Sequence, residues 1–161
     1  MGTLKLNLGE FDQVDYTLIA IHTTLEDFRL AYFINSQLPI LLKKCGNDIK
    51  LKNKEGEAAF SHFSYDDVQK DMFWSLVENT KNVAVSALAS NTLFADDETA
   101  DNVKIHLLPE LKKVDYFLKI ENTDDYFNPE EIVKKLKQID WISAAYEVDA
   151  EKIKSKNNLI F

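Results

Sequence analysis

The chain has 161 residues, of which 45% are apolar and 29% are charged, and its formal net charge is -8. This length fits one domain with a sizeable core, and the apolar fraction is too high for a disordered chain. The negative charge argues against nucleic-acid partners and anionic membrane surfaces. Only four glycines occur, and no two lie close enough to form a phosphate-binding loop, which excludes dinucleotide-binding and P-loop folds.

The first half of the chain predicts a strand, a helix and then a block of strands. After a polar lead-in at residues 1–13, the aliphatic run at 14–22 predicts a buried strand. Thr23 and Glu26 have capping-box spacing and predict a helix at 25–38. This helix is apolar around most of its circumference, so we expect it to be deeply buried or packed against a partner. Further strands are predicted at 39–42, 49–52, 58–65, 72–78 and 83–89, with a turn at 79–82, although the alanine-rich segment 83–89 also fits a helix.

The second half predicts a strand–helix–strand unit. An exposed acidic loop at 95–102 precedes strands at 103–108 and 113–121. Asn128, Pro129 and Glu131 form a strong helix start, and alternation at 142–148 predicts a closing strand. The tail at 150–161 ends in apolar residues, which predicts docking on its own domain or on a twin subunit.

This order predicts a single α+β domain over residues 1–161. We expect a mostly antiparallel sheet with two main helices on one face, in a ferredoxin-like or ACT-like arrangement. The sequence of Val14-Asp15-Tyr16 recurs as Val114-Asp115-Tyr116. This echo is explained either by duplication of a strand–helix element or by the similar needs of two central strands.

Residues 108–116, LPELKKVDY, resemble the signature for which the IPExxxVDY family, small proteins of Bacteroidota, is named. The signature is matched at Pro109, Glu110, Val114, Asp115 and Tyr116, and Leu108 replaces its isoleucine. The resemblance implies a bacterial protein and brings no assigned activity with it.

The candidate functional residues are Glu110, Asp115, Tyr116 and Asp15. Strand alternation predicts that the Tyr116 ring lies in the core with its hydroxyl bonded to a partner. Asp115 faces the other way, where it caps a loop, pairs with a lysine, or joins Glu110 and Asp15 in a carboxylate site.

Other chemistry has weak support in the sequence. His22, His62 and His106 lie on separate predicted strands without metal-ligand spacing, so we expect neither a metal site nor a cofactor. Cys45 is the single cysteine, which suits a reducing cytoplasm. No apolar stretch is long enough for a membrane span.

We therefore expect a non-enzymatic cytoplasmic interaction or regulatory protein that acts as a homodimer, with a partner not identified by the sequence. The surplus of aromatic residues leaves a second hypothesis open, an ACT-like domain that binds a small molecule. A third hypothesis is an enzyme that uses Glu110 and Asp115.

Overall fold

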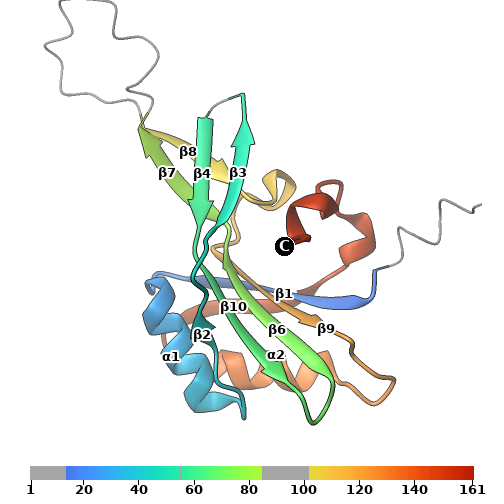
Figure 1. Cartoon of the computed structure of the whole chain (residues 1–161). Coiled ribbons are helices and arrows are strands. Elements are labelled where there is room, and N and C mark those ends of the chain that lie inside the picture. Colours follow the sequence, from blue (N-terminus) through green and yellow to red (C-terminus); the bar gives the residue numbers. More distant parts are fainter. Residues whose placement is uncertain (1–13, 55, 85–101) are drawn as a thin grey trace, which may run out of the picture.

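A computed structural model of the chain describes residues 14–54, 56–84 and 102–161 (Figure 1). The predicted lead-in at 1–13, nearly all of the acidic loop at 95–102 and most of the strand expected at 83–89 lie outside these residues. The described elements are β1 (Tyr16–Thr23), α1 (Asp27–Gln37), β2 (Lys43–Lys44), β3 (Ile49–Asn53), β4 (Gly56–Phe60), β5 (His62–Asp67), β6 (Met72–Glu78), β7 (Thr80–Ala84), β8 (Asn102–His106), η2 (Pro109–Leu111), β9 (Tyr116–Glu121), α2 (Pro129–Lys137), β10 (Ile142–Val148), η3 (Ala150–Lys152) and η4 (Lys156–Leu159).

The main sheet has six strands in the order β10-β1-β9-β6-β5-β2, and every neighbouring pair is antiparallel. The elements β1-α1-β6 and β9-α2-β10 each form a split β-α-β unit, which together give the connectivity of a ferredoxin-like fold. Strands β5 and β2 extend the sheet beyond β6. The predicted α+β class, with a mostly antiparallel sheet and two main helices, is confirmed.

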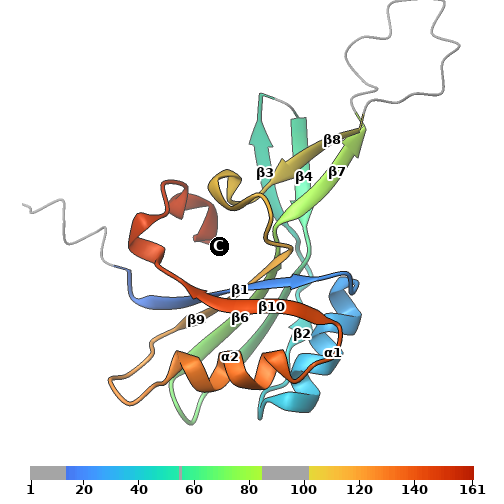
Figure 2. The same cartoon turned by 180° about the vertical axis from the view of Figure 1, so that it is seen from behind.

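Both helices cover the same face of the sheet (Figure 2). Alternate residues of the central strands point to this helix side, among them Ile19 and Ile21 of β1 and Leu118 of β9. They pack against Leu30 and Ile34 of α1 in one continuous apolar core. Helix α1 is buried on this side and exposes Phe28 and Tyr32 on the other.

The opposite face, which we call the tail side, carries a second core. It is covered by the small sheets β3-β4 and β7-β8 and by the tail at residues 150–161 (Figure 1). Leu18, Phe117 and Leu159 are fully or almost fully buried there. Because the strands β1, β6 and β9 are covered on both faces, they contain long apolar runs as well as alternating segments.

The strands β6 and β7 follow one another with only Asn79 between them. The chain bends at Asn79, and β7 then leaves the main sheet to pair with β8. The predicted turn at 79–82 is therefore wrong. The strand predicted at 58–65 is likewise divided at Ser61 into β4 and β5.

The predicted start is wrong for helix α1 and confirmed for helix α2. The N-cap of α1 is Glu26 and not Thr23, so the predicted capping box is wrong. Thr23 belongs to β1, and its hydroxyl donates to the carbonyl of Trp141. The predicted start of α2 is confirmed, since the Asn128 side chain accepts a hydrogen bond from the Glu130 amide.

Asparagine and aspartate replace glycine at two tight turns. Asp71 between β5 and β6 and Asn122 after β9 adopt positive φ angles of 53° and 60°. These residue types tolerate the left-handed region better than most others. Among the described residues, neither α1 nor α2 is long and apolar enough to cross a membrane.

The two copies of the sequence echo do not occupy equivalent positions. Tyr16 packs on the tail side, whereas Tyr116 belongs to the helix-side core. The two strands pair antiparallel, with Tyr16 opposite Glu121 and Tyr116 opposite Ile21. The two split β-α-β units repeat a connectivity, but the echo is not in the register of that repeat.

Candidate functional site

The motif segment 108–116 is wrapped around the buried side chain of Asn79, which is 0% exposed. Asn79 makes five hydrogen bonds of 2.8–2.9 Å with this segment and the residue before it. Its side chain donates to the carbonyls of Leu111 and Val114 and accepts from the Leu108 amide, while its backbone bonds Leu107 and Asp115. The motif therefore has a fixed conformation at the bend between β6 and β7.

Three motif side chains connect this segment to distant parts of the chain. Glu110 accepts hydrogen bonds from the amide and the hydroxyl of Ser155 in the tail, at 2.7 and 3.0 Å. Asp115 accepts from the Thr23 amide at the end of β1, at 2.9 Å. The Tyr116 hydroxyl donates to the Leu25 carbonyl before α1, also at 2.9 Å. These contacts give the motif residues structural roles.

The pKa values of two motif residues reflect these contacts. Partial burial acts to raise the pKa of Glu110, but the hydrogen bonds from Ser155 outweigh it and hold that pKa below its ordinary value. Burial, followed by nearby carboxylates of which Glu78 contributes most, raises the pKa of Tyr116 far above its ordinary value. Tyr116 therefore stays protonated and donates its hydrogen bond throughout the physiological range.

The structure does not bring the predicted carboxylates together. Asp15 lies just before β1 and Asp115 binds the last residue of that strand, so about 25 Å of extended chain separates them. Glu110 instead faces the tail. No group of three acidic, histidine or cysteine side chains in residues 14–54, 56–84 and 102–161 is placed to hold a metal ion.

The three histidines are also dispersed. The ring of His22 bonds the Tyr146 hydroxyl at 3.0 Å, and that of His106 bonds the Thr80 hydroxyl at 3.1 Å. His62 lies on β5, and its ring meets the ring of Phe161 with the centroids 4.8 Å apart. The free thiol of Cys45 donates to the Ser64 hydroxyl rather than to a histidine.

A polar row crosses the tail side of the sheet at its centre. Strand register places Lys119 of β9 beside Ser75 of β6, and Ser75 beside Ser64 of β5. Lys119 is only 5% exposed. Its ammonium donates to the Leu159 carbonyl at 2.7 Å, lies 3.3 Å from a carboxylate oxygen of Glu121, and approaches the rings of Tyr16 and Phe161. Much of this buried cation's surroundings is thus supplied by the tail.

Sequence reasoning missed both Asn79 and Lys119. Asn79 was assigned to a turn because asparagine is common in turns. The strand alternation places Lys119 on a polar face that the apolar Phe117 interrupts. This interruption is the available signal that the face is partly covered. What the pattern could not show is that the tail returns to bury the lysine.

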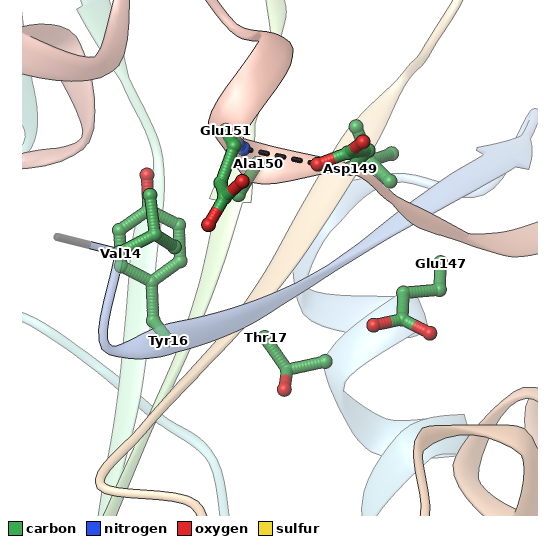
Figure 3. Close-up of a pocket in the computed structure, with 8 residues that line it drawn as sticks. Val14, Tyr16, Thr17, Glu147, Asp149, Ala150 and Glu151 are labelled. Atoms are coloured by element: carbon green, nitrogen blue, oxygen red, sulfur yellow. Dashed lines mark hydrogen bonds between the residues drawn. The ribbon is translucent and has the colours of Figure 1, made fainter.

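An open cleft of about 480 Å³ lies beside the start of β1 (Figure 3). Tyr16 and Thr17 of β1 line one side, and Glu147, Asp149 and Glu151 come from β10 and the segment after it. Asp149 accepts a hydrogen bond from the Glu151 amide, which caps η3. The walls are acidic, and the Asp149 carboxylate is engaged in this local structure.

The strand β10 forms one edge of the main sheet. It has seven residues and contains neither proline nor lysine, and its outer edge pairs with no other described strand. The opposite edge is β2, which has only two residues, both lysine. A groove of about 370 Å³ runs between β10 and α2, with Tyr146 and Glu147 on one wall and Lys134 and Lys137 on the other.

Comparisons of the chain with protein-family models, curated proteins and solved structures find no match. A functional assignment therefore rests on the geometry of the chain itself.

Proposed function

We propose that the protein is a non-enzymatic interaction protein that acts as a homodimer, in which the β10 strands of two copies pair edge to edge. The observation that carries this proposal is the long unprotected edge at β10. Natural sheets usually protect their edges with short strands, lysine, proline or a covering segment, because exposed edges pair with other chains. The β2 edge is protected in this way, and among the described residues the β10 edge is not.

The surface around β10 is complementary to itself. Antiparallel pairing about a twofold axis at Ala145 places Ser143 opposite Glu147 and Ala144 opposite Tyr146, so no two like charges meet. The adjoining groove contains Glu130 and Glu147 together with Lys134 and Lys137. A second copy brings the same charges in the reverse direction, which allows opposite charges to face each other. The exposed rings of Trp141 and Tyr146 supply apolar area.

Two further parts of this assignment, the location and the family, are also our proposals. The lone thiol Cys45 supports a cytoplasmic location. The match at Pro109, Glu110, Val114, Asp115 and Tyr116 supports membership of the IPExxxVDY family. Glu110 and Asp115 already hold structural hydrogen bonds to different segments, so they are poor candidates for catalysis and we do not propose an enzyme.

The test is the molar mass in solution, measured by size-exclusion chromatography with light scattering. We expect the mass of a dimer for the unmodified chain. The double substitution S143K/E147K sets lysines opposite each other across the axis, so this variant should have the mass of a monomer while its circular dichroism stays unchanged.

The matched control is S36K/E57K, which makes the same charge change at exposed positions on α1 and β4. It should remain a dimer. A monomeric unmodified chain at high concentration would disprove the homodimer, and a dimeric S143K/E147K variant would show that another surface forms it.

A further inference from the structure

The tail side has an unusual concentration of buried polar atoms without a hydrogen-bond partner. Among the described residues four buried side-chain polar atoms have none, and three of them belong to the tail side: the Tyr16 hydroxyl, the Ser75 hydroxyl and Nε2 of His62. The fourth, on Trp74, belongs to the helix side. An unsatisfied buried polar group costs about 1–3 kcal/mol, so such groups are expected where something binds them.

These three atoms come from three different strands on both sides of β9: Tyr16 is on β1, whereas Ser75 and His62 are on β6 and β5. Ser75 is the register neighbour of Lys119 on β6. Tyr16 on β1 has its ring 4.9 Å from the Lys119 ammonium. His62 on β5 meets Phe161, whose ring centroid also lies 4.9 Å from that ammonium. On the β6 side of Lys119, the sheet therefore presents the ammonium, the Ser75 hydroxyl and the His62 imidazole near the end of the tail.

The imidazole is neutral in this position. Burial lowers the pKa of His62, and the positive charges of Lys119 and Lys44 lower it further. Neutral imidazole adds no second positive charge beside Lys119, and Asp48 is the acidic group that faces it. Lys119 is paired with the Glu121 carboxylate at the strand end, and the wall of the neighbouring cleft adds Lys50 and Asp48, one charge of each sign.

Space for a ligand lies directly beside these groups. A cleft of about 490 Å³ is lined by His62, Ser64 and Phe73 on the sheet and by Ile160 and Phe161 of the tail. This volume is within the usual range for small-molecule sites. Phe161 lines the cleft, its ring also lies beside the Lys119 ammonium, and it is 45% exposed. Leu159, two residues earlier, is buried, so the tail can stay anchored while the Phe161 ring moves.

We propose that this cleft is a binding site for a small aromatic carboxylate, whose ring replaces that of Phe161 beside His62 and whose carboxylate accepts hydrogen bonds from Lys119 and Ser75. The phenyl ring of Phe161 already fits between His62 and the Lys119 ammonium, so the ring of a ligand fits at the same position. An anion is favoured because the Lys119 ammonium and the unpaired Ser75 hydroxyl can both donate hydrogen bonds. A monoanion fits better than a polyanion because Lys119 and Lys44 are already paired with carboxylates and the whole chain is acidic. The inference is independent of dimerisation.

The experiment is an NMR titration of the full chain with phenylacetate, following the backbone amide signals of Ser75, His62 and Lys119. The neutral isostere 2-phenylacetamide is titrated in parallel. We expect phenylacetate to shift these signals and the amide to bind at least about tenfold more weakly, because it lacks the charge that Lys119 pairs with. The substitution Phe161→Ala removes the competing ring and should tighten phenylacetate binding about tenfold.

Two variants make the test specific. Val68→Ala truncates an exposed apolar side chain between β5 and β6, outside the cleft, and should leave the affinity unchanged, which makes it the control for Phe161→Ala. Ser75→Ala in the Phe161→Ala background should weaken binding about fivefold through one lost hydrogen bond. The proposal is overturned if phenylacetate does not bind the Phe161→Ala variant, if the amide binds as tightly, or if Phe161→Ala and Val68→Ala have equal affinities.

Discussion

At the scale of single residues, Asn79 fixes the motif segment through five hydrogen bonds. Both hydrogen-bonding atoms of its side chain are used on the motif segment, and its backbone adds two more bonds to the same region. A hydrophobic residue of the same volume could fill the site but could not satisfy the amide and the two carbonyls that converge there. The motif residues therefore depend on a side chain about 30 positions earlier in the chain.

Asn79→Ala should lower the free energy of unfolding by about 3–5 kcal/mol, because three buried backbone groups lose their partner. Urea unfolding followed by circular dichroism measures the change. Asn82→Ala, at an exposed position of β7, is the control and should change stability by less than about 0.5 kcal/mol. A loss below about 1 kcal/mol for Asn79→Ala would contradict the role assigned to the side chain.

The residues that sequence reasoning could not place are those whose partners are distant in the chain. The helix start at Asn128 was predictable because its cap partner is Glu130, two positions away. The same kind of local rule failed at Thr23, because its hydroxyl is taken by Trp141, more than 100 positions further on. The site around Lys119 was not predictable for the same reason, since β1, β5, β6, β9 and the tail all contribute to it.

At the scale of elements, the tail is held by apolar packing and by two charged side chains, since Lys119 donates to the Leu159 carbonyl and Glu110 binds Ser155. Glu110 of η2 accepts two hydrogen bonds from Ser155, and these hold the pKa of the carboxyl below its ordinary value. A carboxyl with a lowered folded-state pKa stabilises the fold above its unfolded-state pKa. This stabilisation is lost as the pH falls through the folded-state value.

We therefore expect the stability difference between the unmodified chain and Glu110→Gln to depend on pH. At pH 7 the variant should be less stable by up to about 1 kcal/mol, a modest value because the carboxylate is largely exposed and screened by solvent. The difference should shrink below the ordinary glutamate pKa and vanish in more acidic solution. Urea unfolding at a series of pH values measures it. Glu57→Gln on β4 is the control, and an equal pH dependence in both variants would refute the role of the Ser155 contact.

At the scale of the whole molecule, one sheet serves two cores. The class of the fold could be predicted because strand alternation and helix starts are local signals. The division into a helix side and a tail side could not, because it depends on the bends at Ser61 and Asn79 and on the return of the tail. Since β1, β6 and β9 contribute alternate residues to both cores, loosening one core removes support from strands that also form the other.

This coupling predicts a single cooperative unfolding transition. Leu159→Ala on the tail side should cost about 2–5 kcal/mol, the usual range for a buried leucine. The loss should appear equally in far-ultraviolet circular dichroism and in the fluorescence of Trp74, which lies in the helix-side core. For the fluorescence measurement, every variant and the reference carry Trp141→Phe, which leaves Trp74 as the only tryptophan. Ile160→Ala, at an exposed neighbour, should leave both midpoints unchanged at the same protein concentration. If Leu159→Ala shifts the circular dichroism midpoint while that of Trp74 stays in place, the two cores unfold separately, and the tail is then a cover that can detach without disturbing the helix side.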